Sequence, residues 1–152
     1  MDIRTSTHAD NQRLVIALTG DPQFLVDIRY EPEKHSLRVI QGGSRRLFFY
    51  EADTFFPSRG ILLNEYGLVV GKLQMRSSEK GLIQLDDTRV SVLDEPGKGW
   101  VELQVQGLSE PVFWHYDSAH TQVAVHSDPI LFRSVLLVLA WSVGVAVLQQ
   151  QA

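Results

Sequence analysis

The chain has 152 residues, 44% of them hydrophobic and 21% charged, a composition that suits one folded domain with its own core. It holds no cysteine, which excludes disulfides, thiolate metal sites and a cysteine nucleophile, and fits a reducing cytoplasm. The formal net charge of −4 argues against nonspecific nucleic-acid binding, because that binding needs several phosphate contacts.

The charge is spread unevenly along the chain. Residues 29–80 carry nine Lys and Arg against six Asp and Glu, whereas residues 81–152 carry three against eight. A locally basic face can meet anionic lipid headgroups, although an ordinary solvated surface explains the same bias. Residues 1–12 are polar and mixed in charge, without the apolar stretch of a secretory signal, and we expect them to form a flexible N-terminus.

From residue 13 onward, short apolar or alternating runs are separated by Gly, Pro, Asp and Asn. Runs bounded by turn residues at such regular spacing are typical of an all-β sandwich or barrel. We predict eleven strands, at residues 13–18, 24–30, 36–41, 45–51, 61–64, 68–76, 82–85, 88–94, 100–106, 111–117 and 121–127. Residues 64–67 and 94–99 have the composition of hairpin turns.

Alternation within the strands separates a wet face from a buried one. Lys72, Gln74 and Arg76 share one side of their strand, and Leu73 and Met75 share the other. A barrel with a filled interior requires this pattern.

The C-terminal segment has a different character. Asp128 is a suitable N-cap and Pro129 suits the first helical position, so we predict a helix over 129–148, followed by a tail at 149–152. The helix has apolar residues on every face, so it must be surrounded. A helix of about 20 residues is about 30 Å long, which matches a bilayer as well as the interior of a small domain.

We favour the interior of the domain for this helix. Arg133 lies inside the segment, and no cluster of Lys or Arg flanks either end. A membrane tail anchor with a cytoplasmic β-domain is the alternative. The side chains expected to form the core of the helix are Leu131, Val135, Leu136, Val138, Leu139, Trp141 and Val145.

Two stretches resemble the tubby-like superfamily, which includes the tubby C-terminal domain, the phospholipid scramblases and the plant LURP-one-related proteins. "ILLNEYGLVVGKLQ" (61–74) is similar to the family's strand–turn–strand, and "DPILFRSVLLVLAWSV" (128–143) to its closing helix. The resemblance implies an all-β fold with one helix, a closed antiparallel barrel of about 11–12 strands around the hydrophobic C-terminal helix. Gln149–Gln151 stand where the plant members carry an acidic residue.

The resemblance also implies a non-enzymatic module that binds phosphoinositides or associates with a membrane surface. Tubby domains bind headgroups through basic side chains on the barrel exterior. The nearest equivalents here are Lys72 and Arg76, with Arg45, Arg46 and Arg59 as further candidates, since guanidinium groups suit phosphate. The same side chains could instead keep a β-surface soluble and its edges unpaired.

Other chemistry finds little support in the sequence. His115 and Asp117 share a strand face, with His120 and His126 downstream, but their spacing matches no metal motif. The carboxylates needed for a calcium loop are missing. Asp86–Asp87 reads as a hairpin turn. We therefore expect no enzyme, no catalytic residue, no metal and no cofactor.

Aromatic residues offer a second kind of contact. The segment Phe55-Phe56-Pro57 is the best candidate for an exposed apolar loop, while the other aromatic residues suit core packing. We expect a cytoplasmic protein, peripheral at the membrane, that binds anionic phospholipid and no nucleic acid. A domain that binds an unknown protein partner without a ligand is the alternative.

Overall fold

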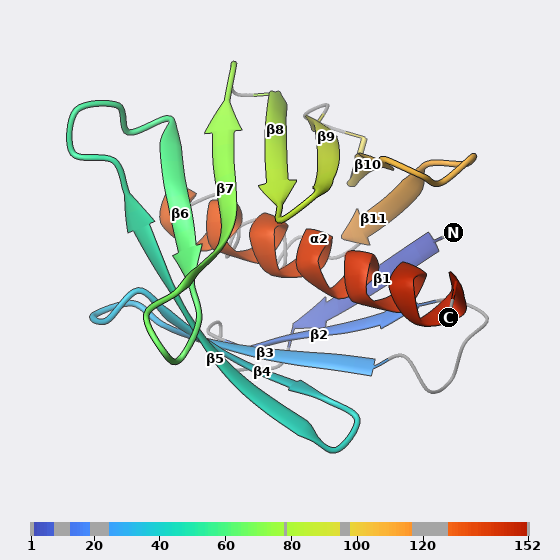
Figure 1. Ribbon diagram of the computed structural model, residues 1–152, viewed down its shortest axis with the longest axis horizontal. Coiled ribbons are helices and arrows are strands. Elements are labelled where there is room, and N and C mark those ends of the chain that lie inside the picture. Colours follow the sequence, from blue (N-terminus) through green and yellow to red (C-terminus); the bar gives the residue numbers. More distant parts are fainter. Residues whose placement is uncertain are drawn as a thin grey trace.

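The computed structural model describes the backbone of residues 2–7, 13–18, 25–77, 79–94, 98–116 and 128–151. This part of the chain is mostly β-structure, with one long helix that follows the strands (Figure 1). The strands are β1 (Asp2–Thr7), β2 (Arg13–Leu18), β3 (Leu25–Glu31), β4 (Ser36–Gln41), β5 (Ser44–Ala52), β6 (Arg59–Leu63), β7 (Val69–Met75), β8 (Lys80–Leu85), β9 (Thr88–Asp94), β10 (Trp100–Val105) and β11 (Val112–Tyr116), and the helix is α2 (Pro129–Gln151).

Strands β3 to β11 form a nine-strand antiparallel sheet in which each strand pairs with the next along the chain. Strand β2 pairs antiparallel with β3 and with β1, and β1 also lies parallel to β11. Consecutive antiparallel pairing needs only short connections, which agrees with the closely spaced turn residues of the sequence. The prediction of a mainly β chain with one C-terminal helix is confirmed.

The strands alternate between an inner and an outer face as the sequence predicts. In β7, Leu73 and Met75 are buried, while Lys72 and Gln74 are exposed. The inner side chains of β3 to β11 and the helix form one apolar core. Its largest fully buried side chains are Trp114, Tyr50, Phe48, Ile28, Leu37, Leu62, Leu73, Ile83 and Leu103.

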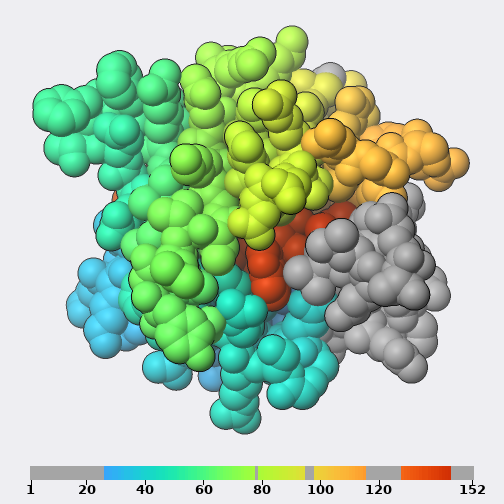
Figure 2. Space-filling view, in the orientation of Figure 1, coloured from blue at the N-terminus to red at the C-terminus, as the bar shows by residue number. Residues whose placement is uncertain are grey.

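Helix α2 lies against the inner face of the sheet and packs on β5, β7, β8 and β10 (Figure 1). It begins where Asp128 caps it: Oδ1 of Asp128 accepts the backbone N–H groups of Ile130 at 3.0 Å and Leu131 at 3.1 Å. The described side chains of the helix at Leu131, Phe132 and from Val135 to Ala140 are buried, and the space-filling view shows only part of the helix (Figure 2). The helix therefore buries its apolar surface against the protein's own sheet.

Five of the seven predicted core side chains of the helix are buried: Leu131, Val135, Leu136, Val138 and Leu139. Trp141 is partly buried and packs edge-on against Phe48 of β5, with 5.1 Å between the ring centroids. The side chain of Val145 lies outside the described residues.

Gly71 of β7 allows the helix to approach the sheet closely. A Cβ at this position would lie 3.0 Å from Cδ2 of Leu85 and 3.3 Å from Cδ2 of Leu137 on the helix. On the other side, the ring of Phe132 stacks on Trp114 of β11, with centroids 6.2 Å apart. Sheet and helix thus meet along complementary surfaces, as a close-packed core requires.

Three sequence predictions differ from the structure or fall outside it. Helix α2 continues to Gln151, so most of the tail predicted at 149–152 belongs to the helix. Residues 2–7 form strand β1, although residues 1–12 were expected to be flexible. Their few apolar residues give little signal, and the strand owes its place to pairing with β2 and β11. The strand predicted at 121–127 lies outside the described residues.

Candidate functional site

A groove of about 660 Å³ lies on the outer face of β6, β7 and β8, beside the loop that joins β5 to β6. The volume is in the range of small-molecule sites. Its lining includes two of the predicted basic residues, Arg59 and Lys72. The other walls are apolar, acidic or amide-bearing, and include Phe55, Ile61, Leu82, Glu51, Asp53, Gln74 and Gln84.

Strand register explains how the groove residues come together. Ile61 of β6 lies opposite Lys72 of β7, and Lys72 lies opposite Gln84 of β8. Arg59 lies opposite Gln74, two residues further along the same face of β7. Side chains on one face of neighbouring strands are about 5 Å apart, so these residues share one surface.

The β5–β6 loop is held in a defined shape by its own hydrogen bonds. Oδ1 of Asp53 accepts the backbone N–H groups of Phe55 at 2.8 Å and Phe56 at 3.1 Å. The backbone N–H of Asp53 donates to the carbonyl oxygen of Arg59 at 2.9 Å, and that of Arg59 to the carbonyl oxygen of Phe56 at 2.9 Å. Asx turns of this kind fix a loop locally.

The loop is also tied to the rest of the domain. The backbone N–H of Met75 in β7 donates to the carbonyl oxygen of Ser58 at 2.8 Å. The guanidinium of Arg133, in the first turns of α2, donates to the carbonyl oxygen of Pro57. The loop projects from the body of the molecule between β5 and β6 (Figures 1 and 2).

This braced loop displays two phenylalanines to solvent. Phe55 is 86% exposed and Phe56 is 55% exposed. The guanidinium carbon of Arg59 lies 4.8 Å from the centroid of the Phe56 ring, within cation–π distance. The exposed loop predicted at residues 55–57 is confirmed, and one of its rings lies beside a predicted basic residue.

The remaining basic candidates lie elsewhere. Arg76, just after β7, lines a second hollow of about 290 Å³ over β8 to β10, together with Lys80 and Glu102. Arg45 is exposed near the start of β5 and lies opposite Ile40 of β4. Arg59 and Lys72 therefore share the groove, whereas Arg76 and Arg45 lie outside it.

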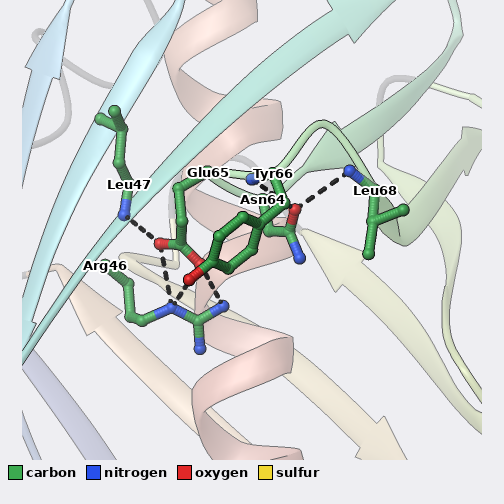
Figure 3. Close-up of polar contacts among 6 residues, drawn as sticks. All are labelled: Arg46, Leu47, Asn64, Glu65, Tyr66 and Leu68. Atoms are coloured by element: carbon green, nitrogen blue, oxygen red, sulfur yellow. Dashed lines mark hydrogen bonds and ion pairs between the residues drawn. The ribbon is translucent and has the colours of Figure 1, made fainter.

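Arg46 forms part of a separate cluster near the β6–β7 turn. It shares the face of β5 that carries the buried rings of Phe48 and Tyr50. Its guanidinium binds the carboxylate of Glu65, with Nη2 2.9 Å from Oε1 and Nε 3.0 Å from the same oxygen (Figure 3). The guanidinium carbon also lies 5.3 Å from the ring centroids of Phe48 and Trp141.

The electrostatics of this cluster follow from its hydrogen bonds. The Arg46 side chain and the backbone N–H of Leu47, 3.1 Å from Oε2, both donate to the Glu65 carboxylate and lower its pKa. Asn64 shapes the same turn, because its Oδ1 accepts the N–H groups of Tyr66 at 2.9 Å and Leu68 at 3.0 Å (Figure 3). Arg46 thus holds the turn against β5.

Comparisons with models of protein families, with curated proteins and with solved structures found no match to this chain.

The histidine cluster considered as a metal site lies mostly outside the described residues, because Asp117, His120 and His126 are not among them. His115 is described, and its ring lies 6.3 Å from that of Phe113. Among the residues with described side chains, no group of three or more His, Asp or Glu is placed to hold a metal ion.

Sequence reasoning did not single out the acidic half of the groove. Glu51 and Asp53 line it together with the two cations. Glu51 could have been found from alternation, since it faces the same way as Phe49 and Leu47, but its place opposite Ile61 depends on the pairing of β5 with β6. Asp53 comes directly after β5, and an Asp at the start of a loop is a sequence signal for an Asx turn.

Proposed function

We propose that the protein is a non-catalytic module that attaches peripherally to anionic membrane surfaces through the β5–β6 loop and the adjoining groove. The observation that carries this proposal is the pair of exposed rings, Phe55 and Phe56, on a braced loop next to Arg59 and Lys72. Exposed aromatic rings beside cations are the chemistry of reversible attachment at a lipid interface.

The apolar and the electrostatic contributions to membrane binding are each modest, and both favour attachment. Burial of one Phe side chain in an apolar environment contributes about 1.5–3 kcal/mol. Each Lys or Arg near an anionic leaflet adds about 1 kcal/mol, and salt screens this part. Because the loop is already ordered by Asp53, insertion of its rings costs little conformational entropy. Attachment of this strength is reversible.

We propose the architecture of a tubby-like barrel for this module, with the strands closed around α2. The burial of the helix against the inner face of the sheet supports it. So does the pairing of β1 with both β2 and β11, which joins the two ends of the strand series in the order β1-β11-β10-β9-β8-β7-β6-β5-β4-β3-β2. A closed barrel leaves no strand edge unpaired.

The second candidate is a protein-interaction domain without a lipid ligand. It is favoured by the balanced charge of the groove, in which Glu51 and Asp53 stand against Arg59 and Lys72. A second group of exposed apolar side chains at and after the β6–β7 turn also favours it: Tyr66, Leu68 and Val69. The tail-anchor alternative requires a helix that crosses a membrane. No helix among the described residues has the length and apolar character to do so.

Co-sedimentation with vesicles tests the proposal. Full-length protein is mixed with phosphatidylcholine vesicles, with or without phosphatidylserine, at low and high salt. The double variant Phe55→Ser/Phe56→Ser removes the apolar tip, and Tyr66→Ser is its control because Tyr66 is an equally exposed ring, 82%, on another turn. Lys72→Glu reverses a charge in the groove, and Lys34→Glu reverses a charge on the β3–β4 turn, which does not line the groove.

The proposal predicts that wild-type protein and both controls sediment with anionic vesicles at low salt. The Phe55→Ser/Phe56→Ser and Lys72→Glu variants should each lose most of this retention. If wild-type protein ignores all vesicles, or if Tyr66→Ser and Lys34→Glu weaken retention as much as the test variants do, the lipid proposal fails. The protein-interaction candidate then takes its place.

A further inference from the structure

Two exposed arginines lie opposite each other on the outer face of the sheet, on strands different from those of the groove. Arg29 of β3 lies directly opposite Arg38 of β4, and both side chains are exposed. Strand β2 lies on the other side of β3, and its residue Arg13 is the register partner of Arg29. The pairings thus place arginines at matching positions on three neighbouring strands, whose spacing is about 4.8 Å.

Like charges directly opposite each other destabilise an antiparallel pair, so this arrangement needs compensation. Among the residues with described side chains, Arg29 and Arg38 have no ion pair and no hydrogen bond from their guanidinium groups. The nearest carboxylates of β3 lie two residues to either side of Arg29: Asp27 opposite Ile40, and Glu31 opposite Ser36. Asp27 has interactions of its own, and Glu31 accepts the Ser36 hydroxyl at 3.5 Å.

We infer that Arg29 and Arg38 form a binding site for a phosphate monoester. Guanidinium groups on two directly opposite residues can both donate N–H groups to one ligand, and a tetrahedral oxyanion has enough oxygens to accept from both. The two positive charges of the site also favour a doubly charged anion over a singly charged one. A carboxylate brings one negative charge, whereas a phosphate monoester brings about −1.5 to −2 at neutral pH and compensates both arginines.

This site is separate from the groove of the proposed function, because it lies on β3 and β4 and shares no residue with the β5–β6 loop. Either proposal can therefore fail without the other. The ligand chemistry is shared by a soluble phosphate ester and by a lipid with a terminal phosphate, and the experiment distinguishes these two sources.

Thermal unfolding of the full-length protein with increasing glycerol phosphate tests the site, since a ligand that binds only the folded state raises its melting temperature. We expect a saturable rise for wild-type protein and for Arg89→Gln, an exposed arginine that faces Gln84. Arg38→Gln should weaken the apparent affinity at least tenfold, and Arg29→Gln/Arg38→Gln should abolish the rise. Phe55→Ser/Phe56→Ser should bind glycerol phosphate like wild-type protein.

The charge requirement gives a second readout. The second pKa of a phosphate monoester is about 6, so binding at pH 5 should be about tenfold weaker than at pH 7.5. Inorganic sulfate remains a dianion over this range and should bind equally at both values. Unchanged glycerol phosphate affinity at pH 5 would contradict a site selective for the dianion.

Vesicles then identify the source. A lipid headgroup is identified if the protein is retained on phosphatidic acid vesicles but not on phosphatidylglycerol vesicles. This retention should be lost in Arg38→Gln and should be competed by glycerol phosphate. Binding of glycerol phosphate without such retention identifies a soluble ester. The inference is overturned if wild-type protein shows no saturable rise in melting temperature, or if the double arginine variant responds as wild-type protein does.

Discussion

Gly60, in β6 beside the groove, offers a sharp test of the packing between the strand that carries Arg59 and the core beneath it. A Cβ at position 60 would lie 2.6 Å from Cε2 of Tyr50, and still closer to Cζ and Oη of the same ring. Tyr50 is 1% exposed, so its ring has no open space to move into. Gly60→Ala should therefore force the ring or the strand to shift.

The cost follows from the known penalty for overpacking a core, about 1–3 kcal/mol. We expect Gly60→Ala to lower the free energy of unfolding by about 2 kcal/mol. For a chain of this size that corresponds to a melting temperature lower by about 4–8 °C. Urea denaturation and calorimetry measure the two quantities.

Gly43→Ala is the matched control, because a Cβ at Gly43 would meet nothing within 4 Å. It should leave stability within about 0.5 kcal/mol of wild type. In a Tyr50→Leu background, Gly60→Ala should cost less than half as much, since the atoms that oppose the methyl group are gone. Equal costs at positions 60 and 43, or an unchanged cost beside Leu at position 50, would refute the packing described here.

Three further predictions concern polar groups. Tyr50→Phe should raise the free energy of unfolding in urea by about 1 kcal/mol, because among the described residues the buried Tyr50 hydroxyl has no hydrogen-bond partner. The Glu65 carboxylate has a lowered pKa, so its ion pair with Arg46 stabilises the fold above the ordinary carboxyl pKa of 4.5 and is lost as pH falls through the lower folded value. The stability difference between wild type and Glu65→Gln, followed by denaturation from pH 7 downward, should therefore shrink in acid; a constant difference would contradict it. Asp128→Ala should cost about 1 kcal/mol in the same assay through loss of the N-cap, whereas Asp128→Asn should cost only a few tenths.

Local signals in the sequence predicted local structure well. Asp128 was expected to cap the helix and does so, and the turn at Asn64 forms as its composition indicates. The alternating burial of β7 was likewise read from its residues alone. These features depend on hydrogen bonds and side-chain directions within a few residues of the chain, which the sequence specifies directly.

Features that depend on strand pairing could not be predicted in the same way. The facing of Arg29 and Arg38 requires the register of β3 and β4, and a shift by one residue would remove it. The groove likewise requires Lys72 to lie opposite Ile61. Arg46 was expected on the outer face with the other basic candidates, but it shares the inner face of β5 with Phe48. Because Phe48 and Phe49 are adjacent and point to opposite faces, the sequence alone did not decide between the two sides.

The place of α2 in chain order has a consequence for biosynthesis. The helix follows every strand of the sheet, so the ribosome releases β3 to β11 before the element that covers their inner face. Until Pro129 and the residues after it have emerged, the helix side chains that complete the core around Leu73, Ile83 and Leu103 are missing. At about 5–20 residues per second, this interval lasts a few seconds, during which nascent strands are prone to aggregate and are natural clients for chaperones.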